Sequence, residues 1–302
     1  MKKLLFIYNP NAGKGLIKSK IAEIIDIFIK GGYLPTVYAT QSYKDAYNMT
    51  KTFPEEYDLL VCSGGDGTLD EVVSGMMKRA HRIPIGYIPA GSTNDFAHSL
   101  RISRNMLEAA QVAVSGTPFH CDIGSFNGDT FVYIAAFGMF TDISYATSQE
   151  VKNVLGHLAY VLEGMKRIYN IPAYYMKIEY NNTEYIEGNF MFGMVTNSRS
   201  VGGFKTIVGS NVVFDDGEFE VTLVRKPNNI IELQEIVASL LIEQINSKYM
   251  ESFKASSVKF ICEEEVAWTL DGEFGGEHES VEIINRNKAL DIMLVERVHD
   301  EN

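Results

Sequence analysis

The sequence predicts an α/β N-terminal domain with a mostly parallel sheet and flanking helices, followed by a mainly antiparallel second domain. Short apolar runs alternate with amphipathic helical segments up to about residue 116, which is typical of βαβ units. The dipeptide Asn127-Gly128 is then a strong hairpin signal, and the strands after it follow one another across turns. A chain of 302 residues can form two such domains with cores of their own.

A glycine-rich turn joins the central strand and helix of the first domain. Residues 59–61 form a short apolar run, as in a strand buried on both faces. Apolar residues then follow a helical stripe. Thr68 and Glu71 have the spacing of a capping box, so the helix is expected to begin at Thr68. A second cap is expected at Ser42, before a short helix.

The turn itself is a candidate phosphate site. Gly64, Gly65 and Gly67 leave backbone N–H groups bare at a helix N-terminus, where the dipole favours an anion. Asp66 lies inside this turn, and its carboxylate would repel a phosphate unless a cation sat between them. The combination favours a Mg-bound phosphate over glycines that only let the chain turn.

Three more strands are expected in the first domain, at residues 4–8, 36–39 and 84–88. They run into loops that begin at Asn9, Thr40 and Gly91. In parallel sheets, ligands bind where the carboxyl ends of the strands meet. These loops and the glycine turn are therefore expected to share one crevice.

The second domain reads as a series of strands with few helices. Helices are expected at about residues 151–168 and 230–245. An apolar run at 290–295 could belong to either domain. The expected strands are at residues 120–126, 130–137, 174–180, 185–195, 219–224, 258–262, 267–270 and 281–284.

Composition excludes several classes of protein. The formal charge of −12 and a pI near 5.0 argue against nucleic-acid binding. The sequence has no apolar run long enough to span a bilayer, and its N-terminus lacks the features of a signal peptide, so a soluble, cytoplasmic protein is expected. The cysteines at 62, 121 and 262 are expected to be reduced thiols.

Familiar nucleotide motifs do not fit. Gly13-Lys14 is followed by Gly15 instead of Ser or Thr, which rules out a Walker loop. The Gly-x-Gly pairs lack the third glycine of a dinucleotide fingerprint. The sequence also has no Gly-x-Ser-x-Gly hydrolase elbow.

Two carboxylates flank a glycine at the end of the expected strand 267–270. Asp271 and Glu273 could supply a base for an attacking hydroxyl and an oxygen ligand for a metal. An ordinary Asp-Gly turn followed by a solvated Glu is the alternative.

Three motifs appear in order, each after an expected strand: Asn9-Pro10-x-x-Gly13, Gly64-Gly65-Asp66-Gly67-Thr68 and residues 91–97 (Gly-Ser-Thr-Asn-Asp-Phe-Ala). In these the chain resembles the bacterial diacylglycerol kinase family of soluble lipid kinases, which is related to sphingosine and ceramide kinases. The resemblance implies a nucleotide-binding domain of residues 1–122 and 286–302, to which the last strand returns. It also implies a β-sandwich domain of residues 123–285 that binds lipid and carries catalytic groups, with the active site between the domains.

The motif match implies which residues line the ATP site. Asp66 would order the Mg²⁺ ion, directly or through water. Three positions, Ala12, Asp70 and Ser92, depart from the common pattern, but none removes an essential charge. The implied ATP-site residues are Asn9, Pro10, Asn11, Ala12, Gly13, Thr40, Gly64, Gly65, Asp66, Gly67, Thr68, Leu69, Asp70, Thr93, Asn94 and Asp95.

In the second domain the resemblance assigns the general base to the Asp-Gly-Glu motif, so either Asp271 or Glu273 would serve. It also implies a second, structural Mg²⁺ held by Asp216 and the backbone carbonyls of Val213 and Glu218, with a surface hairpin without an ion as the alternative. Asp122 matches a family carboxylate that faces the active cleft, and it is a further candidate metal ligand.

The resulting hypothesis is a Mg-dependent kinase that transfers the γ-phosphate of ATP to a lipid hydroxyl, most readily that of diacylglycerol, giving phosphatidic acid for phospholipid biosynthesis. NAD kinase shares the glycine turn but lacks the Asn94–Ala97 block, and it is the second hypothesis. A nucleotide-binding regulator without turnover is the third. The expected partners are ATP and a lipid reached by transient peripheral membrane contact, and a homodimer is left open as an alternative to a monomer.

Overall fold

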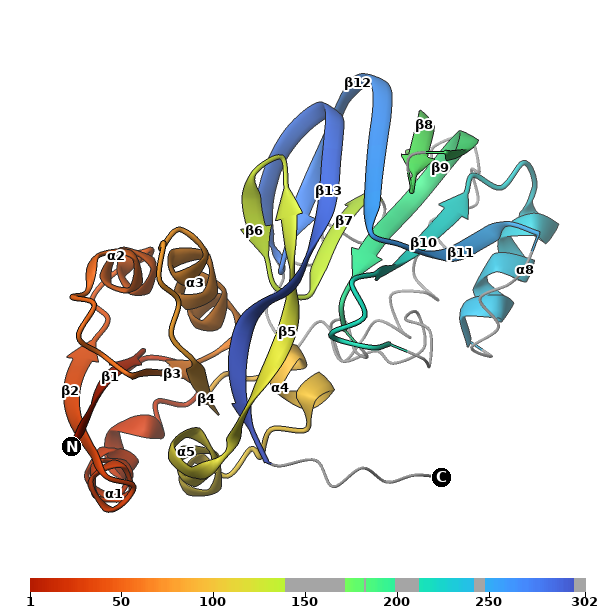
Figure 1. The fold of residues 1–302 in the computed structure, drawn as a ribbon. Coiled ribbons are helices and arrows are strands. Elements are labelled where there is room, and N and C mark those ends of the chain that lie inside the picture. The colour runs from red at the N-terminus through yellow and green to blue at the C-terminus, as the bar shows by residue number, and fades with distance from the viewer. Residues whose placement is uncertain (139–171, 182, 199–211, 242–247, 296–302) are drawn as a thin grey trace, which may run out of the picture. The chain divides into compact units, whose positions relative to one another are not determined.

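The computed structural model describes residues 1–138, 172–181, 183–198, 212–241 and 248–295 (Figure 1). The chain divides into two compact units. One comprises residues 1–123 with 287–302, and the other comprises residues 124–286. Within the described residues, no helix is both long and apolar enough to cross a membrane.

The first unit alternates strands and helices, as expected. Its sheet has the order β13-β4-β3-β1-β2, where β13 spans Glu273–Leu294, and every neighbouring pair is parallel. The end of β13 joins at one edge, where Ile292 pairs with Ile85. The elements are β1 (Lys2–Tyr8), α1 (Ile17–Lys30), β2 (Tyr33–Ala39), α2 (Asp45–Thr52), β3 (Leu59–Gly64), α3 (Asp66–Met77), β4 (Ile85–Pro89), α4 (Asp95–Leu100) and α5 (Met106–Ser115).

Helices cover both faces of this sheet. Figure 1 shows α1 and α5 on one face and α2 and α3 on the other. Phe6 packs against Phe28 of α1, edge to face, with ring centroids 5.3 Å apart. All residues of β3 and β4 are buried, as expected for parallel strands covered on both sides.

The predicted helix caps are wrong in detail. Helix α3 begins at Asp66, two residues before Thr68. The carboxylate of Glu71 accepts hydrogen bonds from the backbone N–H groups of Lys44 (2.9 Å) and Ala46 (3.0 Å). It therefore caps α2, which begins at Asp45 and has no cap from Ser42. A contact between two helices has replaced the local one that the spacing predicted.

The second unit is antiparallel throughout its described pairings. It contains α8 (Ile230–Leu241), whose start agrees with the expectation, whereas the helix expected at 151–168 lies outside the described residues. The strands are β5 (Thr117–Phe126), β6 (Asp129–Phe131), β7 (Ile134–Gly138), β8 (Tyr174–Tyr180), β9 (Glu184–Thr196), β10 (Phe219–Arg225), β11 (Met250–Ala255), β12 (Ser257–Leu270) and β13 (Glu273–Leu294).

Several expected strands join or divide. The runs at 258–262 and 267–270 belong to the single strand β12, and those at 281–284 and 290–295 belong to β13. The run at 130–137 is instead split between β6 and β7. Strand β11 was not expected.

The predicted hairpin at Asn127-Gly128 is confirmed. Phe126 pairs with Asp129, which leaves two residues in the turn. Their φ angles are 48° and 92°, and positive φ at both positions is the requirement of a tight hairpin turn of type I′.

Strands β7 and β8 occupy consecutive stretches of one position in the sheet. Both pair with β9 on one side and with β12 on the other. Strand β7 ends with Gly138 opposite Phe192, and β8 begins with Tyr174 opposite Phe190. The chain therefore leaves this position at Gly138 and returns to it two residues along β9.

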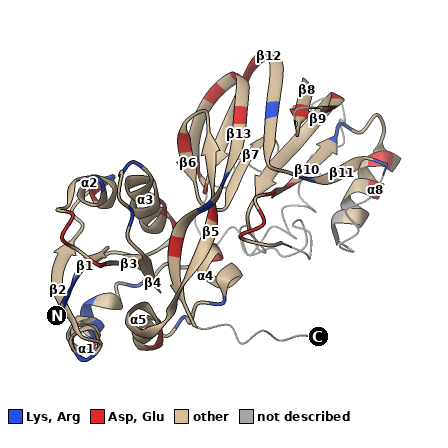
Figure 2. Ribbon diagram, viewed as in Figure 1, with Lys and Arg blue, Asp and Glu red and all other residues tan. Residues whose placement is uncertain are grey.

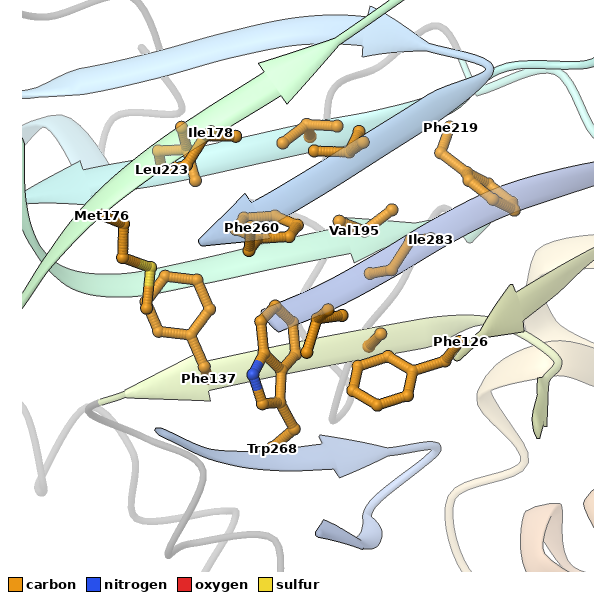
Figure 3. Close-up of a cluster of buried hydrophobic side chains, with 14 of the residues drawn as sticks. Phe126, Phe137, Met176, Ile178, Val195, Phe219, Leu223, Phe260, Trp268 and Ile283 are labelled. Atoms are coloured by element: carbon orange, nitrogen blue, oxygen red, sulfur yellow. The ribbon is translucent and has the colours of Figure 1, made fainter. Parts of the chain in front are cut away.

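One folded-over sheet encloses the core of this unit. The strand order is β11-β10-β9-β7-β12-β13, with β5 on β13 and β6 on β5. Phe131 of β6 nevertheless contacts Phe219 of β10, with ring centroids 5.5 Å apart. Trp268 lies among the buried side chains between the layers (Figure 3), 4.9 Å from the Phe137 ring. The layers of the expected sandwich are thus parts of one continuous sheet.

Candidate functional site

The loops expected to share a crevice all leave the same edge of the first unit's parallel sheet. Strand β1 ends at Tyr8, β2 at Ala39, β3 at Gly64 and β4 at Pro89. Backbone hydrogen bonds continue the ladder beyond the strands. Asn9 N donates to Ser63 O (2.8 Å), and Ala90 N donates to Gly64 O (2.8 Å). The loop backbones are consequently fixed beside one another.

Glycines allow three of these loops to touch. A Cβ on Gly91 would lie 2.5 Å from the Cα of Gly65, and one on Gly13 would lie 2.4 Å from the carbonyl oxygen of Ala90. Gly13 also has a φ of 54°, where glycine is favoured. The glycines are thus required for loop packing, whatever ligand the loops hold.

Asn9 ties the first loop to α3. Its Nδ2 donates to Thr68 Oγ1 (3.3 Å), and its Oδ1 accepts from the backbone N–H of Asn11 (2.9 Å). The second bond is an Asx turn, which shapes residues 9–11. One side chain therefore sets the loop's own conformation and also its position against the glycine turn.

Asn94 does the same for the last loop. Its φ is 55°, a left-handed conformation that asparagine tolerates. Its side chain donates to Gly91 O (2.8 Å) and accepts from Gly91 N (3.0 Å). The Tyr87 hydroxyl donates to Gly64 O (3.2 Å) beneath the loops; sequence reasoning placed Tyr87 only in a strand.

Asp66 and Asp95 bring two carboxylates together at this edge. Each is the first residue of a helix, α3 or α4. Asp66 Oδ1 accepts a weak hydrogen bond from Phe96 N (3.4 Å). Burial and the nearby Asp95 carboxylate raise the pKa of Asp66 to about 6, against the opposing effect of backbone N–H groups at residues 94–96.

This pair suits a divalent cation. Carboxylate oxygens are the hard ligands that Mg²⁺ prefers. A cation would also relieve the repulsion that disfavours charge on Asp66. The donor set therefore fits the Mg²⁺ ion expected from the sequence.

The other predicted nucleotide residues lie along the same edge. Thr40 N donates to Tyr8 O (2.9 Å), directly after β2. Asp70 accepts from Ser74 Oγ (3.5 Å) in α3, and Thr93 O accepts from Arg104 Nη2 (3.1 Å). The side chain of Leu69 is buried in the core, so that this residue can reach a ligand only through its backbone. The remaining predicted positions are Pro10 and Ala12 in the first loop and Gly67 in the first turn of α3.

In the second unit, Asp271 is a structural acceptor. Its carboxylate receives hydrogen bonds from three consecutive backbone N–H groups, those of Val132 (2.5 Å), Tyr133 (2.9 Å) and Ile134 (3.0 Å). These residues join β6 to β7. The same bonds explain why the run at 130–137 is divided into two strands.

Asp271 is the first residue of the two-residue turn between β12 and β13, and Glu273 directly follows that turn. Leu270 pairs with Glu273, and Asp271 and Gly272 have φ angles of 51° and 89°, as a type I′ turn requires. Asp271 is buried, whereas Glu273 is exposed. The two carboxylates, equivalent in the sequence, are different in the structure.

Asp122 holds the chain where β13 enters the first unit. Its Oδ1 accepts from Asn287 Nδ2 (3.0 Å) and from Lys288 N (2.7 Å). Lys288 has a φ of 51°. The fully buried Asp122 carboxylate thus serves the backbone here, and its role as a metal ligand stays a prediction.

Asp216 is paired with a lysine. Its Oδ2 lies 2.7 Å from Lys254 Nζ, and its Oδ1 accepts from Glu218 N (3.1 Å). Lys254 also lies 3.4 Å from Glu220, which is 6% exposed. Burial raises the pKa of Glu220 to about 7, although Lys254 opposes this. Glu220 was not singled out in the sequence, where it reads as an ordinary strand residue.

Lys254 therefore balances the charge of Asp216. The second Mg²⁺, held by Asp216 and the carbonyls of Val213 and Glu218, stays a prediction. Over the described part of the chain, no three His, Cys, Asp or Glu side chains cluster as a metal site. The Asp66–Asp95 pair contains only two such groups.

Comparison with known proteins gives a consistent result. Residues 3–126 match the model of the diacylglycerol kinase catalytic domain. The chain is 35% identical over 278 residues to "Diacylglycerol kinase" of Bacillus subtilis (strain 168), covering 91% of each chain. It is 34% identical over 278 residues to the protein of the same name from Staphylococcus carnosus (strain TM300), covering 91% of this chain and 90% of the other.

Solved structures share the fold. A diacylglycerol kinase from Bacillus anthracis str. Sterne superposes with a TM-score of 0.74 at 22% identity, covering 97% of this chain and 96% of the other. An NAD kinase from Archaeoglobus fulgidus in complex with ATP superposes with a TM-score of 0.52 at 12% identity, covering 97% and 94%. At these identities the likeness concerns the fold alone.

Proposed function

The chain belongs to the diacylglycerol kinase family, and on this basis we propose that it transfers the γ-phosphoryl group of ATP to the hydroxyl of diacylglycerol, giving phosphatidic acid. The observation that carries this proposal is the Asp66–Asp95 carboxylate pair at a sheet edge built from glycine-rich loops. Phosphoryl transfer depends mainly on positioning and on electrostatic stabilisation. Rigid loops beside paired carboxylates suit that requirement.

The loops of the first unit would bind the nucleotide. Backbone N–H groups around Gly13, Gly65 and Gly91 would receive the phosphates, because glycine lets a ligand approach the backbone closely. Asn9 and Asn94 hold two of these loops in place. They would act by positioning the backbone.

Asp66, with Asp95 beside it, would hold Mg²⁺. When bound, the ion neutralises phosphate charge and so lets an anion enter a site that is itself acidic. Without the ion, burial and the neighbouring Asp95 carboxylate both disfavour charge on Asp66 and raise its pKa. The residues thus bind a metal–nucleotide complex in preference to the free nucleotide.

We assign the general base to Glu273 and a positioning role to Asp271. The Asp271 carboxylate already accepts three backbone N–H bonds, so proton uptake there would disrupt the start of β7. Glu273 is exposed and directly follows the turn that Asp271 fixes. A base needs access to the acceptor hydroxyl, and the exposure of Glu273 supports this assignment.

The acceptor would be reached by transient peripheral contact of the protein with a lipid surface. Diacylglycerol has a free hydroxyl and two acyl chains, so it stays within a membrane.

NAD kinase is the disfavoured alternative, because the curated relatives that cover 91% of the chain are diacylglycerol kinases. The NAD kinase likeness reaches only the fold.

Transfer of labelled phosphate from ATP tests this proposal. Diacylglycerol in mixed micelles and NAD in solution would be offered side by side, with Mg²⁺ present. We expect label only in the lipid product and none with Asp66→Ala. Asp26→Ala is the matched control, since Asp26 is an exposed carboxylate paired with Lys30 on α1. Labelled NAD, or turnover by Asp66→Ala, would refute the assignment, and ATP binding without transfer would indicate a regulator.

A further inference from the structure

The first helix after the nucleotide loop carries one lysine that differs from the others. Helix α1 contains Lys18, Lys20 and Lys30, and Figure 2 shows this helix marked in blue. Lys20 lies 2.8 Å from Glu23, and Lys30 lies 2.6 Å from Asp26. Across the described ranges, no carboxylate pairs with Lys18.

Lys18 is attached instead to the loop that precedes its helix. Its Nζ donates to Asn11 Oδ1 (3.4 Å). Asn11 is bonded to Asn9 (2.9 Å), which in turn reaches Thr68 (3.3 Å) beside the glycine turn. The ammonium group of Lys18 is thus held at the sheet edge where the phosphates are proposed to bind.

The charges around Lys18 also favour an anionic partner. A nucleoside triphosphate carries more negative charge than one divalent cation neutralises. Asp66, Asp70 and Asp95, at the N-terminal ends of α3 and α4, add further negative charge at this edge. The first turn of α1 has no acidic residue, so its positive dipole end is left unopposed. A cation placed there lowers helix stability unless an anion binds beside it.

We propose that Lys18 binds a phosphate group of the nucleotide. An amide oxygen is a weak partner for an ammonium group, and a phosphate oxygen is a stronger one. Nucleotide binding would therefore exchange the Asn11 contact for a charged one. This inference rests on the proposed function of the site.

Calorimetric titration of the full chain tests it, with ATP and adenosine as ligands and Mg²⁺ present. Lys18→Met removes the charge and keeps most of the stem, and Lys18→Arg keeps the charge. Lys20→Met is the matched control on the same helix. We expect Lys18→Met to weaken ATP binding about tenfold or more, as for loss of a charged hydrogen bond. Adenosine binding should be unchanged, and Lys18→Arg should bind ATP more tightly than Lys18→Met.

The outcomes separate the two proposals. If wild-type protein binds ATP but Lys18→Met and Lys20→Met weaken it equally, the role of Lys18 is wrong and the proposed function stands. If wild-type protein binds no ATP, both fall. Thermal unfolding of the three variants provides the folding control, and an equal loss of adenosine and ATP affinity in Lys18→Met would also overturn the phosphate contact.

Discussion

The different roles assigned to Asp271 and Glu273 give the sharpest prediction, because one residue should govern stability and the other turnover. Asp271→Ala removes the acceptor of three buried backbone N–H groups, those of residues 132–134. An unsatisfied buried donor costs about 1–3 kcal/mol. Alanine at a φ of 51° adds roughly 1 kcal/mol. With partial rehydration of the freed groups, the free energy of unfolding should fall by roughly 3–6 kcal/mol.

Glu273→Gln should behave in the opposite way. Its side chain is exposed, so the free energy of unfolding should change by less than about 0.5 kcal/mol. Loss of a general base lowers the rate by about 10²–10⁴-fold. The amide keeps the size of the side chain, so ATP binding should be unchanged.

Urea unfolding and the micelle assay measure the two effects on the same preparations. Asp271→Asn is an informative third variant, because asparagine tolerates positive φ and keeps one acceptor oxygen. It should retain more stability than Asp271→Ala. The division of roles would be refuted if Glu273→Gln turned over at the wild-type rate, or if Asp271→Ala unfolded at the wild-type urea concentration.

Three further predictions concern single positions. Asp66→Asn should abolish phosphate transfer. It should nevertheless raise the stability of the metal-free protein at pH 8 by up to about 3 kcal/mol, because the pKa of the Asp66 carboxyl is raised from 3.8 to about 6. Lower stability of the variant in urea unfolding would contradict this. The pKa of the Glu220 carboxyl is raised from 4.5 to about 7 in the folded protein, so folding favours the protonated carboxyl over the carboxylate. Glu220→Gln should have the same stability as the wild-type protein below pH 4.5 and should become more stable than it towards pH 7, by about 3 kcal/mol at most. A difference in urea unfolding that did not depend on pH would contradict the burial argument. Gly91→Ala places a Cβ 2.5 Å from Gly65 Cα. The substitution should lower the free energy of unfolding by about 1–3 kcal/mol and raise the KM for ATP. An unchanged free energy of unfolding and an unchanged KM would refute the close contact.

Much of the first unit could be predicted because its signals are local. Buried parallel strands appear as short apolar runs, and a loop must follow each one. The loops at Asn9, Thr40, Gly64 and Gly91 could therefore be placed at one sheet edge without coordinates. The Asn127-Gly128 hairpin was predictable for the same reason, since two adjacent residues determine its turn.

What could not be predicted depends on contacts between distant residues. The spacing of Thr68 and Glu71 is that of a capping box, but Glu71 instead caps α2 through residues 25 and 27 positions away. Asp271 contacts residues 137 to 139 positions away. Only the fold brings such groups together, so the sequence left Asp271 and Glu273 equivalent as candidate bases.

The shared position of β7 and β8 makes β9 and β12 a common template for two strands that are distant in the sequence. Gly138 faces Phe192 and Tyr174 faces Phe190, so two positions close together on β9 fix two residues that are far apart in the chain. Strands β7 and β8 must therefore keep one register between them. A slip of β9 would move both strands at once, and with them the pairing of β12 that leads to the Asp271 turn.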